Sequence, residues 1–494
     1  MLSFPLVIFA GALSLAPPAP SSPTEPAPAP SIENVEVDEA HASEVAPAPD
    51  SAEAFAEDTG AYVIVDAAPL EPSTERAPPP VEFEAGAMIM VRPEFRRTRD
   101  LEGESTPSTI VPTRLRARFE ARARDFRIHA SFQEARNLAN PIGSPRLGFH
   151  QAFGEYDAEL RNAHLLVRIG RQEYGQGTRH LFWTAPWGAA MRSWDGARVS
   201  LDARRGGFEV FVGSLARPLL SSDLRLTDHV AERQALTWVL DGYVRVREAL
   251  IVELLVTGGH ERDATQLRNI VTSGLRLHGD IAPGLDYEAE GQVQAGEIGI
   301  GQAVQTHLAG TAFAKLDYLT PKPVDRQGKL QLGAFARFDF RSGSQCETAE
   351  IDNPGLPCTS GRNADFHSPW MARHFWYGHA DRFWASNVID GAVNLRAKTA
   401  ATDEITIDLN LTNHIFAFPE PGGMWRNTGG ALIGVDPDNR NPWAAHEADV
   451  EGRLEYRWIR FDIGWHLVTH LAGGRAVSGL AQWQRVYFEI FIDF

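Results

Sequence analysis

The stretch RLRARFEARARDFRIHASFQ, residues 114–133, alternates charged or polar side chains with apolar ones at almost every position. A helix would scatter its arginines around the axis, whereas a strand places them on one face and the apolar residues on the other. The charged pair at 124–125 interrupts the alternation, and the second half of the stretch resumes it. The stretch therefore predicts two antiparallel strands joined by a tight turn.

The same period of two recurs along the chain, for example in LQLGAFARFDF (330–340), EITIDLNL (404–411) and GRLEYRW (452–458). Some connections between the alternating segments are short. Others are rich in Gly, Pro, Asn and Asp, and we expect the long ones at 134–156, 172–194, 341–387 and 414–446. Short turns at one end and long loops at the other are typical of an all-β, transmembrane antiparallel β-barrel of the outer membrane.

Both ends of the chain agree with an exported barrel. MLSFPLVIFAGALSLAPPAP (1–20) has an apolar run followed by small residues, as a secretory signal peptide does, although no Lys or Arg precedes the run. WQRVYFEIFIDF (483–494) alternates large apolar with polar residues and ends on Phe494, which resembles the assembly signal of bacterial outer-membrane barrels. No apolar run reaches the ~20 residues of a membrane-spanning helix, which excludes a helical membrane protein.

Two other all-β architectures, a propeller and a pair of sandwiches, would also suit a chain of this length. A propeller repeats a motif every ~40–50 residues, and the sequence contains no such repeat. The strands are also rich in aromatic residues, enough to form two girdles at the membrane interfaces. These aromatic residues are Trp238, Tyr243, Trp376, Tyr377, Trp384, Trp458 and Trp465.

The 494-residue chain carries a formal net charge of −17, most of which comes from residues 1–80, where 13 acidic residues stand against one basic residue, Arg76. Residues 20–83 are rich in Pro and Ala with acidic residues between them, so they bury too little apolar area to fold. We therefore divide the chain into a signal peptide (1–19), a disordered periplasmic spacer (20–83) and the barrel (84–494). The basic residues are 43 arginines and four lysines, and the planar guanidinium group of Arg matches carboxylates.

Motifs for catalysis and metal binding are missing from the sequence. HExxH, GxSxG and a phosphate-binding loop with Gly-Lys-Ser/Thr do not occur. His374 and His379 make too weak a pattern for a metal site, and DPDNRN (436–441) lacks the glycine and terminal glutamate of the helical calcium loop. Cys346 and Cys358 suit one small disulfide-closed loop in an oxidising compartment. We predict no catalytic residue, no cofactor and no metal.

Two blocks of the sequence resemble the alginate export family of outer-membrane proteins. RIGRQEYGQGTRHLFWTAPWGAAMRSWDGARV (168–199) contains Gly-Arg-Gln-Glu, Tyr-Gly and a later Asp-Gly-Ala-Arg. HFWYGHADRFWASNVIDGAVNLRA (374–397) contains Gly-His and then Asn-Val-Ile-Asp before a strand. The resemblance covers most of the barrel region. It implies a monomeric, eighteen-stranded barrel with a polar, arginine-rich lumen and passive export of an anionic exopolysaccharide.

Alternation and resemblance together nominate residues that line the lumen. Alternation gives one row of cationic side chains, which we call a rail: Arg114, Arg116, Arg118 and Arg122, interrupted by Glu120. A second, shorter rail consists of Arg127 and His129. The family blocks add four lumen-lining positions: Arg171, Arg192, Asp195 and Arg198. They also add Glu173 as a structural pairing partner. Alternation elsewhere adds Arg337, Arg453 and Arg457.

Such a lumen would offer charge-assisted pairs to passing carboxylates, provided that each contact stays shallow. Alternatively, the arginines only pair with Asp and Glu across strands. We expect a conduit that exports an anionic exopolysaccharide beside a periplasmic synthesis or export complex. The alternatives are an anion-selective porin for small solutes or oligosaccharides, and a structural or adhesive barrel. The expected partners are outer-membrane lipid, the polysaccharide, periplasmic synthesis or export proteins and the barrel assembly machinery, and not nucleic acid.

Overall fold

The computed structural model describes residues 81–139, 146–188, 191–216, 235–262, 266–300, 303–325, 329–346, 362–368, 370–402, 404–428 and 432–494. The expected signal peptide, nearly all of the expected spacer and Cys358 lie outside these ranges. The first strand begins at Glu82, close to the predicted start of the barrel.

The chain forms strands from one end of the described region to the other. In the first half these are β1 (Glu82–Val91), β2 (Glu94–Asp100), β3 (Ser105–Ile110), β4 (Pro112–Ala123), β5 (Phe126–Asn137), β6 (Arg146–Leu160), β7 (Ala163–Gln172), β8 (Ser193–Ala203), β9 (Gly206–Ala216), β10 (Ala235–Arg247), β11 (Leu250–Arg262) and β12 (Gln266–Ala282). In the second half they are β13 (Leu285–Ile300), β14 (Ala303–Leu319), β15 (Leu330–Arg341), β16 (Arg362–Asn363), β17 (Val388–Ala400), β18 (Ile405–Ala417), β19 (Trp425–Arg426), β20 (Leu432–Gly434), β21 (Trp443–Tyr456), β22 (Ile459–His470) and β23 (Leu480–Asp493).

In the described part of the chain two short helices accompany the strands, α1 (Arg373–Trp376) and α2 (Ala472–Ser478). Within the described ranges, no helix has the length and the apolar character needed to cross a membrane.

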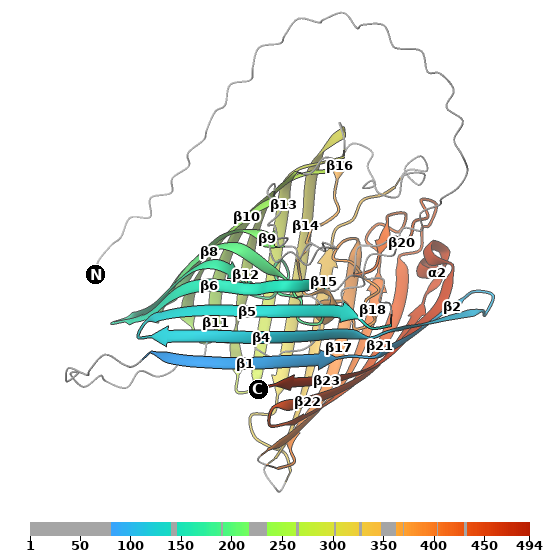
Figure 1. Cartoon of the computed structure of the whole chain (residues 1–494). Helices are drawn as coiled ribbons and strands as arrows, with labels where there is room; N and C mark the ends of the chain where they lie inside the picture. Colours follow the sequence, from blue (N-terminus) through green and yellow to red (C-terminus); the bar gives the residue numbers. More distant parts are fainter. Residues whose placement is uncertain are drawn as a thin grey trace, which may run out of the picture. The chain divides into compact units, whose positions relative to one another are not determined.

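Antiparallel pairing of neighbouring strands closes a barrel of 18 strands in the described part of the chain (Figure 1). β1 and β2 form one interrupted strand that pairs along the last strand, β23, and this pairing closes the ring. β3 and β4 form the next interrupted strand, paired with β2 and β1. Following the ring order, β13 lies halfway around from β4, so these two strands face each other across the lumen.

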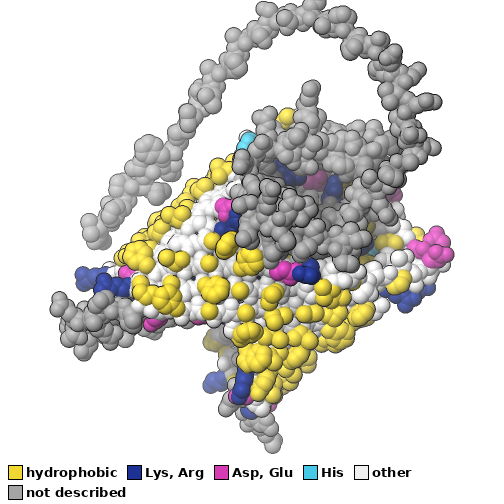
Figure 2. Space-filling model, in the orientation of Figure 1, with side chains coloured by type: hydrophobic (Ala, Val, Ile, Leu, Met, Phe, Trp, Pro, Cys, Tyr) yellow, Lys and Arg dark blue, Asp and Glu magenta, His cyan; other side chains and the backbone are white. Residues whose placement is uncertain are grey.

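The hairpin predicted from residues 114–133 is confirmed as β4 and β5. Its turn contains Arg124 in the left-handed region, with φ 54°. Leu115 and Phe119 are exposed on the outer face of the barrel. Their strand neighbours Arg114 and Arg116 point inward. Because successive strand residues alternate in direction, the outer face is apolar and the lumen is polar. Figure 2 shows hydrophobic side chains spread over the outer surface of the strands.

The two ends of the barrel differ in their connections. We call the end with short turns, such as 124–125, 161–162 and 283–284, the turn end, and the opposite end the loop end. The expected long connections 172–194 and 341–387 agree with the loop-end segments between β7 and β8 and between β15 and β17.

Two other expected loops are shorter than predicted. β5 continues to Asn137 and β6 begins at Arg146, so most of 134–156 is strand. β18 likewise continues to Ala417 and β21 begins at Trp443. At the end of β5 the polar Glu134 and Arg136 lie on the outer face, opposite Leu115 and Thr113, and give this strand end the composition of a loop.

The aromatic residues do not all lie in interfacial girdles. Trp376 and Tyr377 are buried, at 4% and 0% exposure, in a connection that folds into the barrel. Trp458 is exposed in the turn between β21 and β22 at the turn end, where a girdle residue is expected.

Candidate functional site in the barrel lumen

Two connections from the loop end fold into the lumen. Loop A comprises the described residues 173–188 and 191–192, between β7 and β8, and loop B comprises the described residues 342–346, 362–368 and 370–387, between β15 and β17. Their large side chains are buried inside the barrel instead of facing water. The largest of these are Tyr174, Trp187, Phe366, Trp376 and Tyr377.

Loop A is anchored to the wall formed by β1 and β4 through backbone carbonyl groups. Arg114 Nη2 donates to Pro186 O at 2.6 Å and also to the carbonyl of Gly188. Arg92 Nη1 donates to Trp187 O at 2.9 Å, and the Arg92 guanidinium carbon lies 3.4 Å from the centre of the Trp187 ring. Hydrogen bonds from charged donors in a dry environment are strong, so this edge of loop A is firmly held.

The other edge of loop A is bound to the opposite wall. Thr178 Oγ1 donates to Glu290 Oε2 of β13 at 2.7 Å, and His180 Nδ1 lies 2.9 Å from the same oxygen. Gln176 Nε2 donates to Asp241 Oδ2 of β10 at 2.8 Å. Because β13 lies halfway around the ring from β4, loop A crosses the lumen.

Loop B is bound to a different part of the wall. Arg337 of β15 donates to the carbonyl of Trp376 and, at 2.9 Å, to Asp390 of β17. Arg485 of β23 donates to His379 O at 2.8 Å and to Asp381 Oδ2 at 2.5 Å. The wall arginines therefore serve both loops as carbonyl anchors.

A glycine allows loop B to approach the wall closely. Gly378 has φ +79°, and a Cβ atom at this position would collide with the carboxylate of Glu447 on β21. The approach lets Ala380 N donate to Glu447 Oε1 at 2.7 Å. Only glycine combines this backbone conformation with the missing side chain.

The two loops also bind each other. Trp376 Nε1 donates to Thr178 O at 3.0 Å, and Ala372 N donates to Arg179 O at 3.0 Å. The rings of Trp187 and His374 are stacked with centroids 4.5 Å apart. We call the joined loops A and B the septum, because together they extend between walls of the barrel.

The upper part of the predicted cationic rail belongs to the septum. Besides the anchor Arg114, Arg116 Nη1 lies 3.2 Å from Glu173 Oε1, at the start of loop A. His150 Nε2 lies 2.6 Å from the same carboxylate oxygen. Burial would raise the pKa of Glu173, but the hydrogen bond from His150 and the charge of Arg116 outweigh it and lower the pKa to about 2. Glu173 therefore remains ionised and ties loop A to the wall.

The lower part of the rail remains open to water. β4 runs towards the turn end, so Arg118 and Arg122 lie below the septum, in what we call the turn-side chamber. Their side chains are 35% and 55% exposed. Arg118 pairs with Asp493, and Arg122 pairs with Glu120.

Glu120 is the common partner at the centre of the two rails. Besides Arg122, it contacts Arg127 at 3.6 Å and His129 at 3.1 Å, both on the neighbouring strand β5. Arg127 also pairs with Glu155 of β6. The chamber wall is thus a ladder of ion pairs in which Glu120 and Glu155 are each shared between cations.

The residues taken from the first family block separate into two groups. Arg198 pairs with Glu209 at 2.5 Å on the inner face, and Arg192 Nη1 donates to Trp370 O at 3.0 Å inside the septum. Arg171 and Asp195 pair with each other at 2.7 Å on the other face.

The placement of Arg171 and Asp195 corrects the prediction that they line the lumen. Asp195 follows Trp194, which is fully buried against Tyr174 of loop A, so the Asp195 side chain points away from the lumen. Arg171 shares its face with Ile169, which is 64% exposed on the outside. Gly170 between them has φ +128°, and the strand pairing on both sides keeps its register there.

The three arginines that were nominated by alternation alone lie in three different parts of the barrel. Arg337 is a septum anchor, and Arg453 Nε donates to Asp462 Oδ1 at 2.8 Å on the inner face. Arg457 is not in a strand. β21 ends at Tyr456, and Arg457 occupies the turn with φ 53°, where it pairs with the exposed Glu404. The positive φ that the tight turn requires ends the alternation one residue early.

Three residues that hold the septum are not among the site residues nominated from the sequence: Arg92, Glu290 and Arg485. Arg92 lies at the break between β1 and β2, where alternation gives no direction. Glu290 and Arg485 do alternate correctly within β13 and β23. Their direction was readable from the sequence, whereas their partners were not, because those partners belong to connections without periodicity.

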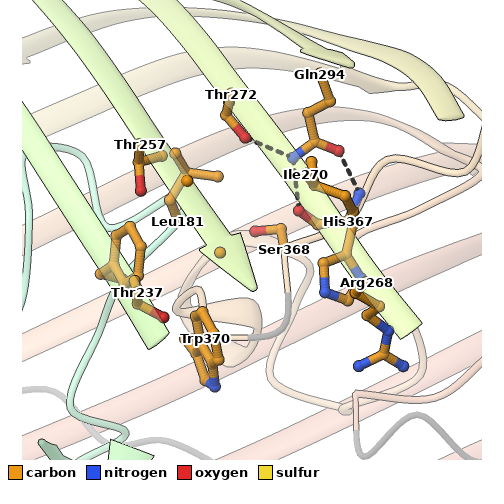
Figure 3. Close-up of a pocket in the computed structure, with 13 residues that line it drawn as sticks. Leu181, Thr237, Thr257, Arg268, Ile270, Thr272, Gln294, His367, Ser368 and Trp370 are labelled. Carbon is orange, nitrogen blue, oxygen red and sulfur yellow. Dashed lines mark hydrogen bonds between the residues drawn. The ribbon is translucent and has the colours of Figure 1, made fainter. Parts of the chain in front are cut away.

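A pocket opens between the septum and the wall near the loop end (Figure 3). Gln294 of β13 bridges Thr272 of β12 and loop B, donating to Thr272 Oγ1 at 3.0 Å and to His367 O at 2.7 Å. Trp370 of loop B and Arg268 of β12 complete the polar and aromatic lining. The hydroxyl, amide and guanidinium groups of this lining can form hydrogen bonds with a polar ligand.

Two further features lie near loop B. Cys346 is disulfide-bonded, and the only other cysteine of the sequence, Cys358, lies outside the described residues. The stretch 436–441 forms a hydrogen-bonded turn, in which Asn439 N donates to Asp436 O at 3.0 Å. Phe494 N and O both bond to Ala87 where the ring closes, while its part in assembly stays a prediction.

Sequence comparison assigns the family. The model of the alginate export family matches residues 84–473 of the chain. The chain belongs to the alginate export family. This assignment and the barrel place the protein in the bacterial outer membrane as a channel-type barrel. A search of curated protein sequences finds no match.

Solved structures similar to this member of the alginate export family include three outer-membrane porins. Pseudomonas aeruginosa OpdO has 10% identity and a TM-score of 0.48, with 83% of this chain and 97% of that chain covered. Acinetobacter baumannii OccAB2 has 8% identity and a TM-score of 0.46, covering 83% and 98%. Pseudomonas aeruginosa OccK2 in complex with glucuronate has 10% identity and a TM-score of 0.47, covering 83% and 97%.

The outer-membrane location orients the barrel. Outer-membrane barrels have short turns in the periplasm and longer loops outside the cell. The turn end and the turn-side chamber therefore face the periplasm, and the pocket of Figure 3 lies towards the cell surface.

Proposed function

We propose that the protein is a passive conduit through which an anionic exopolysaccharide leaves the periplasm. The observation that carries the proposal is the water-exposed arginine ladder of the turn-side chamber, formed by Arg118, Arg122 and Arg127. A polymer that arrives from the periplasm meets this wall first. Its carboxylates can form charge-assisted pairs with the guanidinium groups.

The shared carboxylates make these contacts reversible. Exposed ion pairs contribute only about 0–1 kcal/mol each, so a passing carboxylate can exchange with Glu120 or Asp493 at little cost. When the polymer moves on, the internal carboxylate takes its place again. Repeated, shallow binding of this kind is what conduction requires.

The opposite wall offers a complementary surface. β13 presents Glu288 to the lumen, halfway around the ring from the arginines of β4. Carboxylates accept hydrogen bonds from hydroxyl groups, which every sugar residue carries. A chain of uronate sugars would therefore find cations for its carboxylates on one wall and acceptors for its hydroxyl groups on the other.

The septum favours a second candidate, an anion-selective porin for small solutes or oligosaccharides. Loops A and B narrow the lumen at the level of Arg114, and a narrow passage suits small molecules. Under this alternative the arginine ladder would attract small anions, and the septum would remain closed to long chains. A structural or adhesive barrel is a third candidate, for which neither the ladder nor the pocket would have a use.

Reversal of the ladder charges tests the cationic chamber. In planar lipid bilayers we expect the native protein to prefer anions and the triple variant Arg118→Glu, Arg122→Glu, Arg127→Glu to lose or reverse that preference. Arg457→Glu is the matched control, because Arg457 is exposed at the same end but outside the lumen. Cation selectivity of the native protein, or an equal effect of the control, would contradict the proposal.

Deletion of the gene separates the three candidates. An export conduit predicts that polysaccharide disappears from the cell surface and returns with the native gene but not with the triple variant. A small-solute porin predicts normal surface polysaccharide and reduced uptake of a small anion. A structural barrel predicts that neither changes.

A further inference from the structure

Three side chains meet where loop B touches the wall of the barrel. His379 belongs to loop B, while Glu451 and His466 point inward from the neighbouring strands β21 and β22. All three are buried, and one ligand atom of each lies within 4.8 Å of those of the other two. Two imidazoles and a carboxylate at this separation are a common donor set for a divalent transition metal.

His466 is prepared for a ligand. Its Nδ1 lies 2.8 Å from Asp449 Oδ1, so the carboxylate fixes the orientation of the ring. Its Nε2 is buried and has no hydrogen-bond partner in the described part of the chain. A buried nitrogen without a partner is costly and calls for an ion or a water molecule. An imidazole held by a carboxylate at its other nitrogen is the usual arrangement of a metal-binding histidine.

The other two donors are also held in place by neighbours. Tyr487 donates its hydroxyl to Glu451 Oε1 at 3.1 Å, and Arg485 donates to the carbonyl of His379 at 2.8 Å. The His379 ring is stacked on His374 with centroids 4.5 Å apart. Glu451 and His379 keep 8% and 6% of their surface exposed, whereas His466 is fully buried.

We propose that His379, Glu451 and His466 bind one divalent transition-metal ion, for which Zn²⁺ is the best match, and that the ion fastens loop B to the barrel wall. Tetrahedral Zn²⁺ with bonds of about 2.0–2.2 Å places its ligand atoms roughly 3.4 Å apart, so small side-chain rotations bring the three atoms into the coordination sphere. Water occupies the fourth position. Ca²⁺ and Mg²⁺ prefer oxygen ligands and fit two imidazoles poorly.

Binding of the ion has a structural consequence. His379 now contacts Glu451 directly, and the ion replaces this contact with bonds from both strands to the loop. Loop B is one half of the septum, so its attachment to β21 and β22 limits how far the septum moves. The metal therefore stabilises the narrow state of the lumen.

The test uses the full-length protein, without a polyhistidine tag, in detergent micelles. Zn²⁺ is added, the excess is removed by gel filtration, and the metal that remains bound is measured by elemental analysis. Co²⁺ in place of Zn²⁺ gives an absorption spectrum that reports tetrahedral coordination. We expect one bound ion per chain and the spectrum of a tetrahedral site.

Three variants locate the ion. His466→Gln and His379→Gln are expected to lose the bound ion, and His379 lies on a loop, so its variant keeps every strand residue of the barrel. Asp449→Asn, which changes the carboxylate that orients His466, is expected to weaken binding about 10–100-fold. His307→Gln is the matched control, because His307 is a buried histidine that bonds to Asn363, elsewhere on loop B, and is expected to bind the ion normally.

Heat-modifiable migration shows that each variant is a folded barrel. A native protein that retains no Zn²⁺, or folded His466→Gln and His379→Gln variants that retain it as the native protein does, would overturn the proposal. Chelation of the metal is also expected to raise the bilayer conductance of the native protein and to leave that of His379→Gln unchanged.

Discussion

At the scale of single residues, the arginines of β4 have two different tasks along one face of one strand. Arg114 and Arg116 bind loop A, while Arg118 and Arg122 line the turn-side chamber. Glu120 belongs to the chamber, because it bonds to Arg122 on its own strand and to Arg127 and His129 on β5. The arginines on one face of β4 therefore both support the septum and line the candidate path of the polymer.

The task of Arg114 predicts a specific phenotype. Arg114→Gln removes a charged donor to two loop carbonyls, each such hydrogen bond contributing about 1.5–3 kcal/mol. We expect larger and noisier single-channel conductance from a barrel that still folds. Arg122→Gln, a change of the same kind on the same strand, should leave the conductance level unchanged. Equal conductance of native and Arg114→Gln channels would contradict the anchoring role.

Glu173 predicts a dependence on acid. Its pKa is lowered from 4.5 to about 2 in the folded protein, so the stability that it gives to loop A is present above pH 4.5 and is lost as the pH falls through about 2. Conductance of the native channel should therefore rise over this window. Glu173→Gln should show raised conductance already at neutral pH and a smaller rise in acid. Identical pH profiles of the two channels would count against this interpretation.

At the scale of elements, the sequence predicts strands well and inward-folded loops poorly. The period of two in 114–133 and 483–494 shows which side chains face lipid, because the lipid-facing side of each strand is apolar and the lumen-facing side is polar. Loops A and B have no period, and their direction depends on contacts with strands far away in the sequence, such as Thr178 with Glu290. The arginine faces were thus predictable, whereas their partners were not.

A shortened loop tests the septum as an element. Replacing residues 176–188 of loop A with a short Gly/Ser linker removes its contacts with Arg92, Arg114 and Glu290 together. We expect a folded barrel with a several-fold higher conductance. Trimming the hairpin at 101–104 between β2 and β3, which lies outside the lumen, is the control. If only the control changed the conductance, loop A would not be part of the barrier.

At the scale of the whole molecule, the distribution of charge around the lumen matters more for a ligand than the net charge of the chain. The chain is acidic overall, with a net charge of −17. Nevertheless the wall of β4 and β5 is rich in arginine, and the wall of β11 to β13 opposite carries Glu253 and Glu288, which share Arg276, and Glu290, which contacts His180. Transverse separation of charge orients a ligand that has both anionic and hydroxyl groups, whereas net charge alone says little about the passage.

The central claim is that a long anionic polysaccharide enters the chamber from the periplasmic side. The most direct measurement is the single-channel current while uronate oligomers of increasing length are added on that side. The account predicts transient blockades that last longer as the chain lengthens, become rarer at high salt and largely disappear in the Arg118→Glu, Arg122→Glu, Arg127→Glu variant. Blockades by neutral oligosaccharides of the same length with equal frequency, or exclusion of long uronate chains, would contradict it.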